Sequence, residues 1–160
     1  LVPEYDNLVV VHTLSKSRSL AGLRVGYALG QPNLTAALRC VRDSINSYTV
    51  DRLAQTGGAA AMRDRAYFEA TAAKVQATRE RTAARLRELG FTVYPSAANF
   101  IFISHPDRAA RALLAGLREK GVLVRWFDRP RIDNYLRVSI GTDEEMDAFC
   151  AAVQELLTKT

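Results

Sequence analysis

One long segment with helical periodicity divides the sequence into two parts that differ in their pattern of predicted strands and helices. Apolar or small side chains recur at helical spacing up to Leu89, and Gly90 follows, where a helix commonly ends in a left-handed residue. The residues that carry this spacing are Phe68, Ala72, Val75, Thr82, Leu86 and Leu89. A helix of this length often connects two lobes, so we expect one lobe before it and another after it.

The part before the long helix predicts two strands followed by two helices. Leu8–Val11 is a short β-rich apolar run, and Leu23–Leu29 is a second one between two glycines. Pro32 marks the start of a helix whose apolar face continues to Ile45. A further helical stretch runs from Val50 to Met62, although its Gly57-Gly58 pair costs about 1 kcal/mol per glycine relative to alanine.

The part after Gly90 alternates strands and helices. Short strands are predicted at 91–94, 99–103, 122–127 and 135–140, and a helix from about 109 ends at Gly121. Thr142 and Glu145 have the spacing of a capping box before a C-terminal amphipathic helix. Helices packed over an antiparallel-type sheet predict a compact α+β lobe.

Composition narrows the class of protein. The chain has 160 residues, of which 48% are hydrophobic, and a net charge of +5, which describes an ordinary globular protein. Basic residues alternate with acidic ones over 63–88, and the sequence has no motif of basic and aromatic residues typical of nucleic-acid-binding domains, so we expect no nucleic-acid partner. No apolar stretch approaches a membrane span, and the first residues show no secretory signal, which predicts no membrane partner and a cytoplasmic location. The missing initiator Met suggests a piece of a longer protein.

The cysteines and histidines suggest no metal or disulfide chemistry. Cys40 and Cys150 are too few and too far apart for a disulfide framework, and both lie in helical patterns that predict reduced core cysteines. His12 and His105 have no partners at metal-ligand spacing, so no metal site is expected. His105 precedes Pro106 in a turn and is expected to be exposed.

The stretch T-L-S-K-S-R-S-L-A-G-L-R-V-G-Y (13–27) is the most informative for chemistry. Lys16 is one of only four lysines and lies just after a predicted strand. An amine held there, partly desolvated and near cations, would be a nucleophile for a carbonyl carbon. Thr13 and Ser15 offer hydroxyl groups, and Arg24 offers a fork suited to phosphate. A solvated polar loop without function is the alternative on composition alone.

A second feature is a pair of strand arginines, Arg125 and Arg137. If the last two predicted strands pair through a turn centred on residue 131, the two arginines lie directly opposite each other. Like charges in that position destabilise a strand pair, so an anion bound between them would explain the arrangement. Offset strands, or neutralisation by Asp128 and Asp133, are the alternatives.

The lysine segment resembles the Schiff-base motif of fold-type I aminotransferases dependent on pyridoxal 5'-phosphate (PLP), S/T-x-S-K followed by L-A-G-L-R-x-G, and most closely the histidinol-phosphate branch. The resemblance implies that Lys16 is the catalytic lysine that binds PLP and that Thr13, Ser15 and Arg24 hold the cofactor phosphate. His12 departs from the Arg that this branch often has at that position.

The resemblance extends to the second lobe. L-R-V-S-I-G-T looks like the segment whose arginine binds the substrate α-carboxylate, which implies that role for Arg137. Arg125 matches the strand arginine associated with a distal phosphate, and Asn99 in A-N-F-I-F matches a residue that faces the site. Small-molecule amino acids and 2-oxo acids are the implied substrates, and a homodimer is the implied assembly.

The implied fold is α/β, the C-terminal part of an aspartate-aminotransferase-like PLP transferase. Residues 1–57 would end the large PLP-binding domain, and 58–160 would form the small α+β domain. The implied reaction converts L-histidinol phosphate and 2-oxoglutarate to imidazole acetol phosphate and L-glutamate in histidine biosynthesis. Another fold-type I enzyme, such as an aromatic aminotransferase or a phosphothreonine decarboxylase, or an inactive folding or dimerisation piece, is the alternative. Because the family's Gly-rich turn, stacking aromatic residue and pyridine-pairing Asp have no counterpart here, we expect the isolated piece to be inactive.

Overall fold

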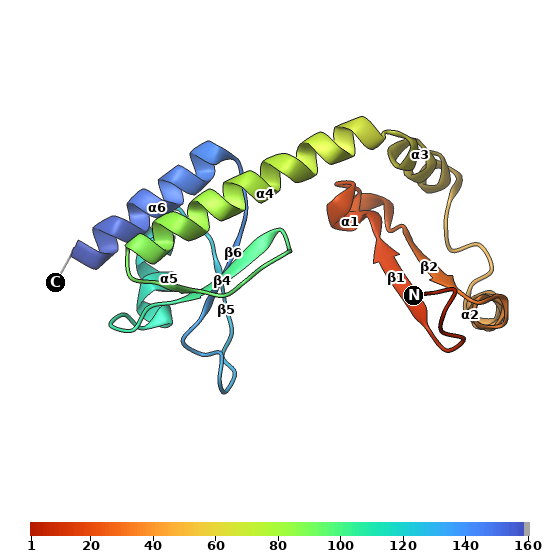
Figure 1. Cartoon of the computed structure of the whole chain (residues 1–160), viewed down its shortest axis with the longest axis horizontal. Coiled ribbons are helices and arrows are strands. Elements are labelled where there is room, and N and C mark those ends of the chain that lie inside the picture. Colours follow the sequence, from red (N-terminus) through yellow and green to blue (C-terminus); the bar gives the residue numbers. More distant parts are fainter. Residues whose placement is uncertain (159–160) are drawn as a thin grey trace. The chain divides into compact units, whose positions relative to one another are not determined.

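The computed structural model describes residues 1–158, which fall into two compact units (Figure 1). The first unit is Leu1–Ala70 and the second begins at Thr71. The boundary lies inside helix α4 (Arg65–Glu88), which confirms the predicted long helix. Among the described residues, no helix is both long enough and apolar enough to span a membrane.

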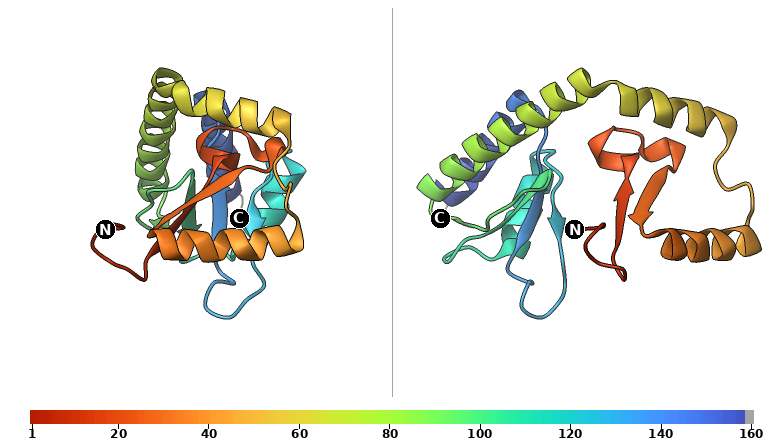
Figure 2. Two further views of the ribbon diagram at one scale, coloured as in Figure 1. Left: turned by 90° about the vertical axis from the view of Figure 1, so that its right-hand side faces the viewer. Right: turned by 45° about the vertical axis from the view of Figure 1, so that its right-hand side comes forward.

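The first unit is built on an antiparallel hairpin of β1 (Val9–Thr13) and β2 (Gly26–Gly30). The connection between these strands contains the one-turn helix α1 (Leu14–Ser17) and the 3-10 turn η1 (Ala21–Leu23). Two helices follow, α2 (Pro32–Ile45) beside the hairpin and α3 (Arg52–Arg63), whose N-cap is Asp51 (Figure 2). Both predicted strands and both predicted helices of this part are present, but the second strand begins at Gly26 rather than Leu23, because residues 21–23 form η1 and Arg24 is left-handed.

The glycine pair in α3 has a packing role that the sequence pattern did not reveal. A Cβ atom on Gly57 would lie 2.8 Å from Leu23 Cδ1, and one on Gly58 would lie 3.4 Å from Leu14 Cδ1. Both leucines belong to the connection between β1 and β2, and Leu14 is only 3% exposed. The two glycines weaken the helix, but because they lack a Cβ atom they allow the loop that contains Lys16 to approach α3 closely.

The second unit is a four-stranded antiparallel sheet with helices on one face. The strand order is β3 (Thr92–Val93), β4 (Phe100–Ser104), β6 (Leu136–Ser139) and β5 (Arg125–Trp126). Alternate residues of β4 and β6 are buried against α4, α5 (Ala110–Glu119) and α6 (Asp143–Thr158). The centre of this core consists of Leu86, Ile101, Ile103, Leu117, Leu136 and Val153. The opposite face of the sheet carries Phe100, Phe102 and Arg137.

The helix ends of the second unit follow the sequence signals. Glu145 N–H donates to Thr142 Oγ1 at 3.3 Å, and Thr142 N–H donates to Glu145 Oε2 at 2.8 Å, which confirms the capping box of α6. Gly90 and Gly121 have positive φ angles of 88° and 76° just after α4 and α5, as helix-ending glycines do.

Three details differ from the sequence predictions. The strand predicted over 122–127 pairs only at Arg125 and Trp126, because Val122 N–H instead donates to Leu117 O and closes α5. Cys40 is exposed, since α2 buries no residue completely, whereas Cys150 lies in the core as expected. His105 is half-buried rather than exposed, because its ring packs edge-on against Phe91 at 4.9 Å.

Candidate functional site

Lys16 lies on α1, a single helical turn held between the two strands of the hairpin. Thr13 caps this turn: its Oγ1 accepts a hydrogen bond from Ser15 N–H at 3.1 Å and donates to Ser15 Oγ at 2.8 Å. Leu14 is the buried residue of the turn, and the side chain of Lys16 is exposed. The turn therefore presents a primary amine next to two linked hydroxyl groups.

The exposure of Lys16 differs from the partial desolvation expected from the sequence. A turn of four residues has one inward-facing position, and Leu14 occupies it. The exposed Lys16 side chain is therefore accessible to a small electrophile.

Arg24 and Gly26 complete this segment at the start of β2. Arg24 adopts the left-handed conformation, and its Nη1 donates to Ala21 O at 2.9 Å, which fixes the guanidinium near the end of η1. Gly26 pairs with Thr13, and a Cβ atom there would lie 2.7 Å from His12 O. A side chain at position 26 is thus incompatible with this strand spacing.

The donor set of this segment fits a phosphorylated carbonyl compound. A dianionic phosphate requires several N–H or O–H donors, and the Ser15 hydroxyl and the other guanidinium N–H groups of Arg24 are of this kind. The Thr13 hydroxyl, which here donates to Ser15 Oγ, would have to turn toward the anion. A carbonyl carbon requires a nucleophilic amine, which Lys16 supplies. The four residues come from one continuous loop, so their chemistry is local to the first unit.

The second unit brings Arg125 and Arg137 together. Arg125 pairs directly with Arg137 across β5 and β6, which is the register inferred from the sequence. Arg137 Cζ lies 5.4 Å from the ring centre of Phe100 and 5.8 Å from that of Phe127, and Arg125 Cζ lies 5.5 Å from the latter. Aromatic rings thus attract both cations and reduce the cost of placing them side by side.

Arg137 has an unused hydrogen-bond donor. Its Nε is buried and has no hydrogen-bond partner among residues 1–158. Within the same residues, neither strand arginine forms an ion pair with Asp128 or Asp133. A buried unsatisfied N–H beside a second cation is the arrangement that an anion would complete. Asn99 lies exposed just before β4, and its carbonyl accepts a hydrogen bond from Ile140 N–H at 2.9 Å.

Comparison with known proteins decides the family. The sequence model of the family described as "Aminotransferase class I and II" matches residues 1–153. The chain belongs to this aminotransferase family. Its residues are 53% identical to histidinol-phosphate aminotransferase from Clostridium acetobutylicum over 98% of the chain, and 54% identical to histidinol-phosphate aminotransferase 1 from Bordetella parapertussis over 99% of it.

The chain spans about 44% of the length of each of these two curated relatives. Its fold also matches the crystal structure of histidinol-phosphate aminotransferase from Sinorhizobium meliloti in complex with pyridoxal-5'-phosphate. The TM-score is 0.84 at 29% identity, and the match covers 95% of this chain and 41% of that one. The α/β architecture expected from the sequence is therefore that of the family.

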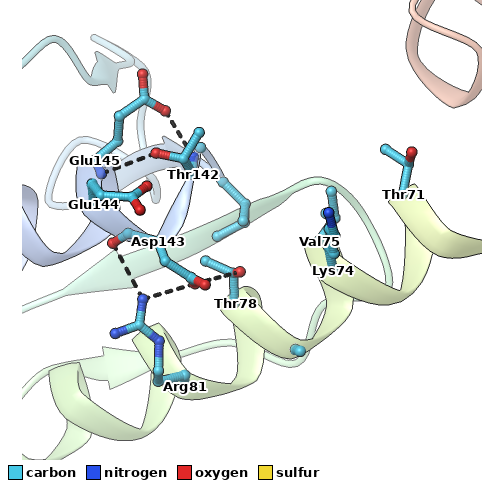
Figure 3. Close-up of a pocket in the computed structure, with 12 residues that line it drawn as sticks. Thr71, Lys74, Val75, Thr78, Arg81, Thr142, Asp143, Glu144 and Glu145 are labelled. Atoms are coloured by element: carbon cyan, nitrogen blue, oxygen red, sulfur yellow. Dashed lines mark hydrogen bonds and ion pairs between the residues drawn. The ribbon is translucent and has the colours of Figure 1, made fainter.

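The second unit also contains a pocket of about 710 Å³ between α4 and the start of α6 (Figure 3). Asp143 lines this pocket and accepts hydrogen bonds from Thr78 Oγ1 at 2.8 Å and Arg81 Nη2 at 2.9 Å. These bonds, first that from Thr78, lower the pKa of the Asp143 carboxyl group. Because Arg81 also bonds Asp147, the contacts join α6 to α4 and serve packing.

Sequence reasoning passed over three residues next to the candidate site. Phe100 and Phe127 flank the arginine pair, and the only available signal was the alternation of Phe100 with buried residues along β4. Arg18 follows Lys16 by two residues, and its guanidinium reaches the end of α3. Nothing in the local pattern indicated that contact, because its partners are 43 and 46 residues away.

Proposed function

We propose that this chain supplies the catalytic lysine and the anion-binding residues of a PLP-dependent aminotransferase that acts on L-histidinol phosphate and 2-oxoglutarate. The observation that carries the proposal is the capped turn that presents Lys16 beside the Thr13 and Ser15 hydroxyl groups. The names of relatives that are 53–54% identical support the substrate. PLP is supported by the family and by the PLP-bound structure from S. meliloti.

Residues of the first unit would hold the cofactor. Lys16 would bind the cofactor through its Nζ, and Thr13, Ser15 and Arg24 would hold the cofactor phosphate. PLP, when bound, accepts the amino group and delocalises the electron pair left when a proton leaves the substrate α-carbon. The Lys16 amine would carry that proton as general base and then return it as general acid.

Arg137, Arg125 and Asn99 would bind the substrate. Glutamate and 2-oxoglutarate carry an α-carboxylate, and histidinol phosphate carries a phosphate ester in place of a carboxylate. The paired guanidinium groups of Arg125 and Arg137 can accept either anion, and the free Nε of Arg137 offers one further donor. Over both half-reactions, the amino group of histidinol phosphate is exchanged for the keto oxygen of 2-oxoglutarate, so no external oxidant is required.

The organisation of the whole protein is part of the same proposal. Residues 1–57 would belong to a large PLP-binding domain and 58–160 to a small α+β domain. A cytoplasmic homodimer is the assembly we propose, and the two free cysteines agree with a reducing compartment.

Reductive trapping tests the role of Lys16. The chain is incubated with PLP and reduced with borohydride, and the modified lysines are located by peptide mass mapping beside a Lys16→Ala control. We expect modification concentrated at Lys16 and lost in the variant. Equal modification of Lys74, Lys120 and Lys159 would contradict an organised cofactor site and favour an inactive folding or dimerisation piece.

A further inference from the structure

The helix that presents Lys16 cannot hold its position by itself. α1 has four residues, and a single helical turn is far too short to be stable alone in water. The position of the lysine amine therefore depends on tertiary contacts on either side of it. On the N-terminal side the tertiary contact is that of the buried Leu14 with α3 near Gly58, and the local cap from Thr13 adds one hydrogen bond.

On the C-terminal side the contact is made by Arg18. Its Nη1 donates to Ala61 O at 3.0 Å and to Asp64 O at 3.2 Å, both at the C-terminal end of α3. Its guanidinium carbon also lies 3.8 Å from the centre of the Phe68 ring. A cation at a helix C-terminus satisfies carbonyl groups that have no partner within the helix and interacts favourably with its dipole.

These contacts are well suited to fix an orientation. The hydrogen bonds and the ring contact constrain the planar guanidinium in different directions, and one guanidinium makes all of them. Every partner lies within the first unit, on the end of α3 and the first turns of α4. Lys16 is thus bracketed by Leu14 and Arg18, which attach the same turn to the same helix.

We propose that Arg18 is the positioning residue for Lys16: by clamping α1 to the end of α3, it keeps the lysine amine aligned with the Thr13–Ser15 hydroxyl pair. Arg18 itself touches no reacting atom. This inference rests on the proposed role of Lys16, which it deepens. Loss of the clamp leaves Lys16 chemically intact but displaced, and a displacement of about 1 Å can reduce a positioned reaction by about a hundredfold.

The test compares Lys16 with the lysines of the second unit in one sample. Arg18→Met removes every donor and keeps an unbranched stem, whereas Arg18→Gln keeps one amide donor. Arg63→Met is the matched control, since Arg63 is an exposed arginine in the last turn of α3, the helix that Arg18 contacts. After PLP and borohydride treatment, mass mapping gives the ratio of modified Lys16 to modified Lys74. Hydrogen exchange of residues 26–30 shows whether the hairpin remains folded.

We expect Arg18→Met to lower the Lys16 to Lys74 ratio at least about tenfold, with Arg18→Gln in between and Arg63→Met unchanged. A general loss of stability would speed hydrogen exchange in the hairpin. Loss of positioning alone would lower the Lys16 to Lys74 modification ratio while the hairpin stays protected from exchange. A ratio in Arg18→Met equal to that of the unsubstituted chain overturns the inference and leaves the function of Lys16 intact. If Arg18→Met unfolds, Arg18→Gln decides by the same criterion. No preference for Lys16 in the unsubstituted chain overturns the proposed function and the role of Arg18 with it.

Discussion

Gly26 allows a sharp test of how the hairpin shapes the lysine loop. A Cβ atom at position 26 would lie 2.7 Å from His12 O, and this oxygen belongs to the backbone, which cannot rotate away as a side chain can. Gly→Ala at a permissive position stabilises a protein by about 0.4–1 kcal/mol through the unfolded state. Overpacking against a fixed group costs about 1–3 kcal/mol, so the clash outweighs the gain and Gly26→Ala is expected to destabilise the hairpin.

The same substitution at Gly22 is the control. Gly22 lies in η1, within the connection between β1 and β2; it has no atom within 4 Å of its would-be Cβ and does not have a positive φ. Gly22→Ala is therefore expected to be neutral or slightly stabilising. Each variant adds one methyl group, and only the one at position 26 meets the backbone of β1.

Hydrogen exchange of the segment 9–30 measures the difference. A cost of about 1–3 kcal/mol raises the local opening equilibrium roughly five- to 150-fold. Exchange in the second unit should stay unchanged, because Gly26 lies in the first unit. Equal protection of the hairpin in Gly26→Ala and Gly22→Ala would refute the claim that close backbone approach requires a glycine at position 26.

Three further predictions concern the second unit and the cysteines. Leu86 is 0% exposed, so Leu86→Ala should lower the free energy of unfolding by about 2–5 kcal/mol, whereas Leu123→Ala, at 80% exposure, should have little effect. Urea unfolding followed by the fluorescence of the single tryptophan, Trp126, measures both variants. Because the pKa of Asp143 is lowered in the folded state, its stabilising contribution is present above the unfolded pKa of about 3.9 and is lost as pH falls through the lower folded value. Acid titration of Trp126 fluorescence should therefore show a weaker pH dependence in Asp143→Asn, and identical titrations would contradict this. Iodoacetamide should alkylate exposed Cys40 and spare Cys150, which is 2% exposed and whose pKa is raised by burial. Mass spectrometry of the native chain measures both sites, and alkylation of Cys150 in preference to Cys40 would contradict the prediction.

The sequence predicted features whose cause lies within a few residues. The capping box of α6 and the end of α4 at Gly90 depend on neighbours within one helical turn, and both are present. The opposed arginines also followed from a short-range argument, since strand alternation and the centre of one turn fix their register. Strand length was less predictable: Val122 and Val124 alternate as strand residues do, but they pack against the core without strand pairing.

Burial was predicted poorly wherever it depends on a distant partner. The apolar spacing in α2 indicated a buried face, yet Val41 and Ile45 are 59% and 82% exposed, and Cys40 is exposed with them. Periodicity states which side of a helix is apolar, and a second element must be present to cover it. The same limit applies to Lys16: its exposure depends on which residues of the short turn α1 pack against other elements, and the local sequence does not specify those elements.

Arg18 and the two glycines of α3 show why the support of the lysine loop was invisible in the sequence. Arg18 bonds backbone carbonyl groups, and every residue type carries a carbonyl, so its partners at Ala61 and Asp64 leave no signature in side-chain identity. Gly57 is informative only once Leu23 is known to lie against it. A local motif can therefore identify the reacting lysine, whereas the contacts that aim it are long-range and partly main-chain. For that reason the clamp at Arg18 should tolerate changes in the side chains of Ala61 and Asp64 better than changes at Arg18 itself.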